Sequence, residues 1–215
     1  MNLIPQALAL LYMTDYKIFL GYLAIIISFA SYVPYFKNIF SGKVKPHAFS
    51  WFVWGLLTTV AFAAQVVDKA GAGAWVTAST ALACYGVFAL ALFKGDRKFS
   101  LFDWVALVSA LIALALWAFT KNPTMSVILV TVVDALGFLP TFRKGYCKPF
   151  EETASLYTAS TVKYIIGIFA LQSLSVSTWL FPASLVITNA IFVLVLLVRR
   201  SQLKNKISIK NARRT

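Results

Sequence analysis

The chain has 215 residues, of which 60% are hydrophobic and 13% are charged. A soluble domain averages ~45–50% apolar and ~25% charged residues, so this composition excludes a water-facing surface and indicates a membrane protein. The formal net charge of +13 comes from basic residues that stand between and after apolar runs, a pattern typical of membrane topology and not of a nucleic-acid partner.

Seven apolar segments follow one another along the chain. A spanning helix needs ~20 largely apolar residues, and short loops rich in Gly, Pro, Ser and Lys separate the candidates. The expected spans are 18–40, 49–67, 74–93, 101–119, 124–142, 155–172 and 178–198. The predicted fold class is therefore an all-α membrane protein with seven transmembrane helices and no soluble domain.

The lysines and arginines predict the orientation. Most of the 20 lie on one side of the seven spans, in the loops after spans one, three and five and in the tail after span seven. Because basic residues are retained on the cytoplasmic side, the N-terminus is expected outside and the C-terminus inside. The predicted location is the inner (plasma) membrane of a bacterium, and the basic tail is expected to touch anionic lipid.

An internal repeat organises the spans. With an offset of 106 residues, "SFASYVPYFKNIF" (28–40) lies over "DALGFLPTFRKGY" (134–146), and Trp51 lies over Tyr157. Spans one to three then superpose on spans five to seven, and span four is left as a connector. An odd number of crossings between the units makes them parallel. The expected organisation is an outer segment (1–17), a three-helix bundle (18–93), a connector (94–123), a second bundle (124–198) and a basic cytoplasmic tail (199–215).

This plan resembles the PQ-loop/SWEET transporter superfamily. The features that carry the resemblance are two parallel three-helix bundles joined by a connector, a proline near the cytoplasmic end of each first helix, and a basic loop after it. The family's Pro-Gln dipeptide is here Pro34-Tyr35 and Pro140-Thr141. Vitamin transporters and a receptor for ER-retrieval signals share the seven-helix plan, so function must come from the site.

The resemblance also implies pocket residues. A SWEET-like pocket offers an aromatic side chain from the second helix and an asparagine from the third helix of each unit. Trp51 and Tyr157 fit the aromatic positions, and Asn189 fits the amide of the second unit. Ala83 stands at the matching position of the first unit, and this departure disfavours a sugar as the solute.

Asp134 and Lys163 are charged residues within apolar spans. Each costs ~2.5–3.5 kcal/mol at a helix centre on insertion scales, so neither is expected to face lipid. Both lie eight residues from the cytoplasmic end of their helix, at one depth, which predicts an ion pair. The pair is either a static clasp or a solute site. In the second case a solute carboxylate that takes Lys163 would leave Asp134 free to bind a proton.

Pro34 and Pro140 occupy equivalent places in the two units. A proline removes a helical hydrogen bond, so each is either a passive kink or a hinge that lets the cytoplasmic half-helix swing. Their repetition favours hinges.

Other aromatic and polar side chains are candidates for the pocket lining. Trp51 is either a membrane-interface anchor or a pocket residue, and Trp54, one turn deeper, is a candidate to stack on a solute. Further candidates for a polar lining in the outer half are Gln65, Thr77, Ser79 and Thr80.

No motif for catalysis, metal or cofactor binding is found. Cys84, Cys147 and His47 do not form a metal-ligand set, and no phosphate loop or nucleophile elbow occurs. The sequence therefore predicts a non-enzymatic transporter of a small polar solute, without cofactor, working by alternating access as a uniporter or with protons. The alternative is a membrane receptor or scaffold that binds a peptide or lipid head group. Both a monomer and a homo-oligomer remain open.

Overall fold

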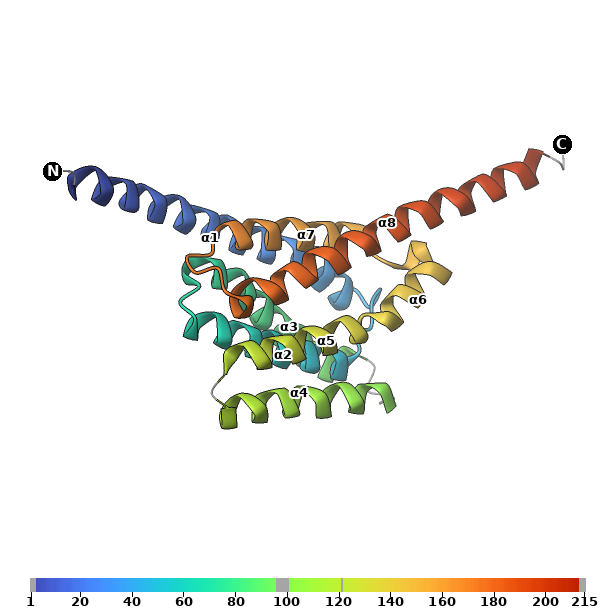
Figure 1. Ribbon diagram of the computed structural model, residues 1–215. Helices are drawn as coiled ribbons and strands as arrows, with labels where there is room; N and C mark the ends of the chain where they lie inside the picture. The colour runs from blue at the N-terminus through green and yellow to red at the C-terminus, as the bar shows by residue number, and fades with distance from the viewer. Residues whose placement is uncertain (1–2, 96–100, 121, 213–215) are drawn as a thin grey trace.

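Eight α-helices run through residues 3–95, 101–120 and 122–212, the part of the chain that the computed structural model describes (Figure 1). Their bounds are α1 Leu3–Phe40, α2 Ala48–Val67, α3 Trp75–Lys94, α4 Leu101–Thr120, α5 Pro123–Gly137, α6 Leu139–Cys147, α7 Ala154–Phe169 and α8 Val176–Ala212. Two short 3-10 helices, η1 (Gly71–Ala74) and η2 (Pro149–Glu151), lie in the connections. Below, α1–α3 are called the first half and α5–α8 the second half.

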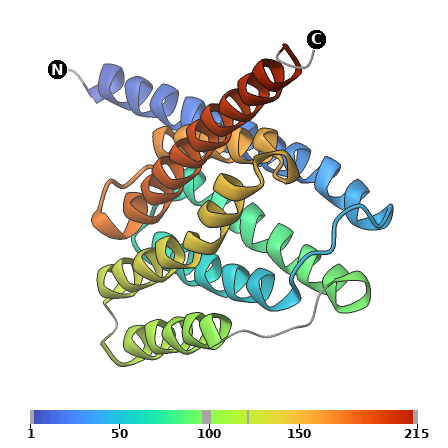
Figure 2. The ribbon, with the colours of Figure 1, turned by 90° about the vertical axis from the view of Figure 1, so that its right-hand side faces the viewer.

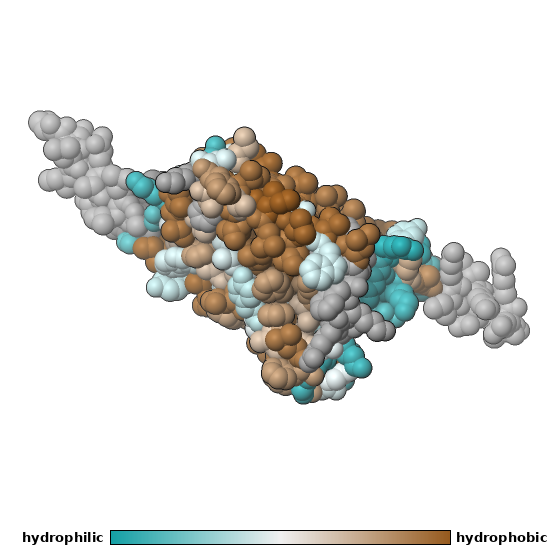
Figure 3. Space-filling view, turned by 90° about the horizontal axis from the view of Figure 1, so that it is seen from below, coloured by the Kyte–Doolittle hydropathy of each residue, from teal (hydrophilic) through white to brown (hydrophobic). Residues whose placement is uncertain are grey.

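The chain is an integral membrane protein by the length and apolar character of its helices. Five segments within the described residues are long and apolar enough to cross a bilayer: Asp15–Phe40, Ala48–Val67, Gly71–Lys94, Pro123–Cys147 and Val176–Lys204. Large apolar side chains such as Phe19, Ile26 and Leu194 are exposed on their outer surfaces. The face shown in Figure 3 is mostly hydrophobic, with hydrophilic residues toward its ends. Such a surface is suited to lipid.

The bounds of three helices follow the predicted breaks. α2, α3 and α4 begin and end within one residue of the expected positions. Helix ends coincide with local signals: the side chain of His47 accepts a hydrogen bond at the start of α2, and Asn122 caps α5 with Pro123 behind it. Two helices are longer than expected, because α1 already runs from Leu3 and α8 continues through the basic tail to Ala212. Residues 1–2 and 213–215 of the predicted end segments lie outside the described residues.

The two prolines differ in their effect on the backbone. α1 passes through Pro34 without interruption. In the second half the helix stops at Gly137, turns at Phe138 and restarts as α6, with Pro140 in the first turn of the new helix. Figure 1 shows α6 turning away from the line of α5. Proline is favoured in a first turn, where its missing N–H leaves no bond unmade.

The helices pack around a ring. α1 contacts α3 and α7, α2 contacts α3 and α5, and α8 contacts α5 and α7. The order around the ring is therefore α1, α3, α2, α5, α8, α7, and each half contributes three neighbours (Figures 1 and 2). α4 lies outside the ring against α5 and α2.

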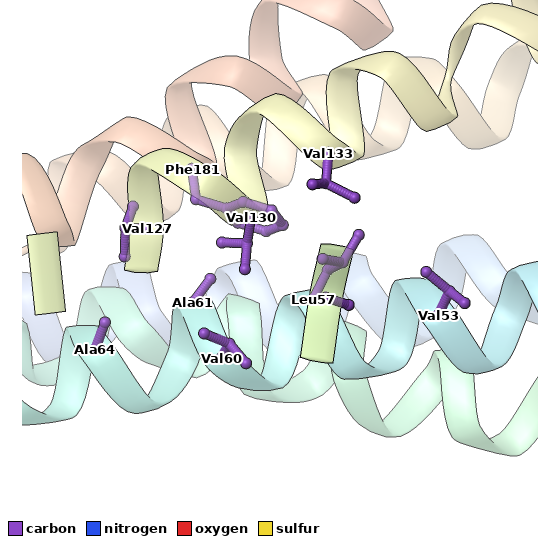
Figure 4. Close-up of a cluster of buried hydrophobic side chains, with 10 residues drawn as sticks. Val53, Leu57, Val60, Ala61, Ala64, Val127, Val130, Val133 and Phe181 are labelled. Carbon is purple, nitrogen blue, oxygen red and sulfur yellow. The ribbon is translucent and has the colours of Figure 1, made fainter. Parts of the chain in front are cut away.

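The largest apolar cluster joins α2 to the second half. Its buried members are Val53, Leu57, Val60, Ala61, Ala64, Ala110, Val127, Val130, Val133 and Phe181 (Figure 4). Small and branched side chains let α2 and α5 approach closely, which is how helices associate where lipid is as apolar as the interface. This cluster fixes the position of α5 beside the central cavity.

Candidate functional site

A cavity of about 640 Å³ lies between the two halves. Small-molecule sites in proteins commonly measure ~300–1,000 Å³, so this space can take a solute of moderate size. The residues at its deep end come from six helices and the α5–α6 junction, and are Tyr32, Trp54, Thr58, Thr80, Cys84, Asp134, Phe138, Ser160, Tyr164, Leu185 and Asn189. Tyr35, Trp51, Leu156 and Tyr157 also line it.

The cavity opens at one end of the molecule. Its lining includes exposed residues of two connections, Lys43 and Lys45 before α2 and Glu151 and Thr153 before α7. His47 and Lys144 lie at the same mouth. This is the end from which α8 projects (Figure 1).

Five of the six predicted solute-binding residues line this cavity. They are Trp51, Trp54, Asp134, Tyr157 and Asn189. The sixth, Lys163, is fully buried and is not among the lining residues. The structure thus brings together side chains from α2, α5, α7 and α8, and their role in binding remains a prediction.

The expected ion pair between Asp134 and Lys163 does not form. Lys163 Nζ instead donates to Ser28 Oγ at 3.1 Å and to Thr80 Oγ1 at 2.9 Å, across the boundary between the halves. It also lies over the rings of Tyr32 and Tyr164, 5.1 and 5.2 Å from their centroids. Hydroxyl oxygens and aromatic faces stabilise the ammonium without a carboxylate.

Asp134 is buried, 6% exposed, and no hydrogen bond or ion pair of its carboxylate is found among the described residues. The offset of 106 residues explains why. Lys163 bonds Ser28 and Thr80, and the counterparts of these three residues are Leu57, Asp134 and Val186. Leu57 cannot donate to a carboxylate and packs instead with Val130 and Val133 (Figure 4).

Asn189 offers an acceptor to the same cavity. Its Nδ2 donates to Leu185 O at 2.7 Å, and because a carbonyl can only accept, this bond fixes which end of the amide is which. Asn189 Oδ1 therefore remains for the cavity, at a side chain that is 5% exposed.

Two matching groups of aromatic residues flank the cavity. Tyr32, in α1, contacts Phe36 and Trp51, each with 6.3 Å between ring centroids. The residues 106 positions later repeat these contacts: Phe138 lies 5.2 Å from Phe142 and 6.0 Å from Tyr157. Trp54 extends the first group, 5.3 Å from Trp51 and edge-on to it. The sequence offset therefore corresponds to an equivalence in space.

Polar bonds join the halves at the end opposite the mouth. Asp68 Oδ2 accepts from Ser175 Oγ at 2.9 Å and from Ser177 Oγ, and Gln172 N donates to Ala70 O at 2.9 Å. Further bonds between the halves run from Gln65 Nε2 to Thr178 O and from Lys17 Nζ to Leu171 O, both at 2.7 Å. We call this set of contacts the latch.

Close helix packing lies directly under the latch. A Cβ placed on Gly73 would be 2.7 Å from Gly167 O, and one on Gly167 would be 2.5 Å from Val76 Cγ1. Backbones can meet this closely only where a side chain is missing. Around the mouth, in contrast, these described polar contacts stay within one half. Lys144 pairs with Glu152 at 2.7 Å in the second half, and Lys94 donates to Phe40 O in the first.

Some site residues were missed from the sequence. Three tyrosines stand in apolar spans without a polar pattern around them: Tyr32, Tyr35 and Tyr164. Asp68 stands in a predicted loop, where a polar residue is expected. Of the four polar residues expected to line the outer half, Thr80 lines the cavity and Gln65 belongs to the latch, whereas Thr77 and Ser79 do neither among the described contacts. No cluster of three or more metal-ligating side chains occurs in the described part of the chain.

The arrangement is a cavity that is open at one end and closed at the other by contacts between the two halves. Its deep end is lined by aromatic rings, hydroxyl groups, one carboxylate and one amide. Comparison of the chain with protein-family models, with curated proteins and with solved structures found no match.

Proposed function

We propose that this protein is a membrane transporter that moves a small solute by alternating access between its two halves. The observation that carries the proposal is the difference between the two ends of the cavity. One end is open between the connections 41–47 and 148–153, and the other is closed by bonds that run from half to half. A receptor needs a pocket, but it does not need a second, latched exit behind it.

The helix arrangement supports this proposal. Two sets of three helices, α1–α3 and α5/α6, α7 and α8, contribute equivalent neighbours to one ring, and α4 lies outside it as a connector. Equivalent aromatic groups flank the cavity on both sides. Pairs of parallel repeats with a solute site between them are an established transporter plan.

We propose different roles for the two halves in the movement. The break at Phe138 separates α6 from α5 directly beside the cavity, so the α5/α6 joint is the hinge that we propose for the second half. In the first half α1 is continuous through Pro34, so movement there would require the helix to bend at the hydrogen bond that proline cannot make.

Orientation follows from charge. The mouth lies on the side of Lys43, Lys45 and Lys144, which the basic-residue rule places in the cytoplasm. The conformation described here would then be open to the cytoplasm and closed to the outside. A bacterial inner membrane, with the N-terminus outside, remains part of the proposal.

Two assays test transport against reception. A thermal-shift screen of the purified protein against sugars, amino acids, nucleosides and vitamins identifies a ligand, and uptake of that radiolabelled ligand is then measured in proteoliposomes and in empty liposomes. Transport predicts protein-dependent, saturable uptake. Binding without uptake would show a receptor or scaffold and would overturn the proposal.

A further inference from the structure

We infer that the solute of this cavity is a small organic cation, bound through its positive charge by Asp134. The inference deepens the proposed function and rests on it for the claim that a solute enters and leaves the cavity. It comes from the polar atoms at the deep end of the cavity and from the cations that do not reach them.

A positive partner would stabilise the buried carboxylate of Asp134, and none of the described residues supplies one. A buried carboxylate without a partner is expensive in a protein and more so within a bilayer. Lys163, the one cation inside the described spans near the cavity, is held by Ser28 and Thr80. The other lysines of the lining stand at the mouth, where Lys144 is already paired with Glu152.

The remaining lining suits the same class of solute. Asn189 Oδ1 is an acceptor, because the amide nitrogen already donates to Leu185 O, so it adds to the carboxylate a second atom that calls for an N–H donor. Trp54 lies beside α5, with its indole nitrogen 3.8 Å from the position of a Cβ on Gly137, one turn after Asp134. Aromatic faces attract cations, and Lys163 over Tyr32 and Tyr164 shows this use of rings close by.

The size of the cavity excludes a bare metal ion as its main occupant. About 640 Å³ lined by rings and a single buried carboxylate does not match the oxygen cage that a divalent cation requires. An organic cation uses both the charge and the aromatic surface. A solute with a carboxylate, in contrast, would meet Asp134 as a like charge.

Three probes that share one ring and differ in charge test the inference. Binding of benzamidinium (positive), benzamide (neutral) and benzoate (negative) to the purified wild-type protein is measured by isothermal titration calorimetry. Charge-assisted hydrogen bonds predict that benzamidinium binds at least about tenfold more tightly than benzamide, and benzoate most weakly. Equal affinities, preference for benzamide or benzoate, or no binding of benzamidinium would overturn the inference.

Two isosteric variants test which carboxylate binds the cation. In Asp134→Asn the preference for benzamidinium over benzamide is expected to fall to within about twofold. Asp15→Asn removes a carboxylate from an exposed position of α1 away from the cavity and should keep the full preference. An Asp134→Asn protein that elutes as a single species and keeps the tenfold preference would contradict the role of Asp134, and the wild-type series stands even if this variant does not fold.

The same probes separate the inference from the proposed function. Uptake of radiolabelled benzamidine into proteoliposomes is measured beside binding. Charge-selective binding without uptake leaves the cation site intact and refutes transport. Uptake of neutral or anionic ligands without preference for cations supports transport and refutes the cation site. If Asp134 only carried protons, uptake would likewise show no preference for cations, and the cation site would be refuted.

Discussion

The second half carries Lys163 on α7 where the first half carries Leu57 on α2, and it carries Asp134 on α5 where the first half carries Ser28 on α1. At the α1–α7 boundary the result is a satisfied polar contact, with Lys163 bonded to Ser28 and Thr80. At the α2–α5 boundary the result is an apolar cluster around Leu57, beside the carboxylate of Asp134, which lines the cavity and has no partner in the described part of the chain. The aromatic groups, in contrast, are alike in both halves.

This comparison separates shared features from specific ones. Residues that repeat, such as Trp51 and Tyr157, shape the cavity from both sides. Residues that do not repeat give it a charge. One boundary between the halves is held by polar bonds, whereas the other is apolar and has beside it an acid with no partner among the described residues. Substitutions on either side of this difference test it.

The largest effect is expected from Gly167→Ala, which gives the second half the alanine that the first half has at Ala61. The new Cβ would lie 2.5 Å from Val76 Cγ1, and overpacking of this kind costs about 1–3 kcal/mol. The melting temperature of the purified protein should fall.

Gly86→Ala is the matched control in α3. A Cβ there meets nothing nearer than Phe36 Cζ at 3.6 Å, so the variant should gain about 0.5–1 kcal/mol from helix propensity. Equal melting temperatures for the two variants would refute the close approach of η1, α3 and α7 under the latch.

Ser28→Ala tests the polar boundary. Removing one of the two hydroxyl acceptors leaves the buried ammonium of Lys163 partly unsatisfied, at a cost of about 1–3 kcal/mol. Adding Lys163→Met removes the charge and should recover most of that loss, since apolar residues often replace buried charges without penalty. Additive losses in the double variant, measured by thermal unfolding, would contradict the described contact.

Asp68→Ala weakens the latch. Ser175 and Ser177 lose their common acceptor, and about 1 kcal/mol of stability is expected to be lost because Asp68 is only half-buried. If the latch closes one end of the transport path, the variant should also spend less time closed there. Faster modification of a cysteine introduced at Ala74, which is buried with Ala70 and Leu171 beside these bonds, reports this change when measured with a membrane-impermeant maleimide. An unchanged rate would argue against a gate.

The smallest effect concerns the native cysteines. Cys147 is exposed, whereas Cys84 is buried in the cavity lining. A maleimide should label Cys147 first and Cys84 slowly, and a bound ligand should slow Cys84 further without affecting Cys147. Ligand protection of Cys147 alone would place the ligand outside this cavity.

The sequence predicted much of the helical framework because composition and punctuation are local signals. Glycine, proline and polar loops mark where α2, α3 and α4 begin and end. The length of α1 and α8 could not be predicted in this way, because hydropathy finds the part of a helix that suits a membrane and not its continuation beyond it.

The sequence predicted several residues of the cavity lining but not the hydrogen bonds around it. The cost of a charge in lipid predicted that Asp134 faces inward, and the resemblance to SWEET-like pockets implied Tyr157 and Asn189; all three line the cavity. Neither argument says which neighbouring helix a side chain meets. The sequence therefore predicted that the two buried charges pair with each other. Lys163 instead reaches α1 and α3, where its partners Ser28 and Thr80 lie 135 and 83 residues away in sequence.

Alternating access requires the two ends of the cavity to open in turn. A cysteine pair at Ala70 and Gln172, whose backbones are joined by a hydrogen bond of 2.9 Å, allows the latched end to be locked by oxidation in a Cys147→Ser background. Uptake of the identified ligand is measured in proteoliposomes before oxidation, after it and after reduction. Alternating access predicts that the locked protein still binds ligand, ceases to transport it and recovers transport on reduction. Undiminished uptake by the fully crosslinked protein would contradict alternating access.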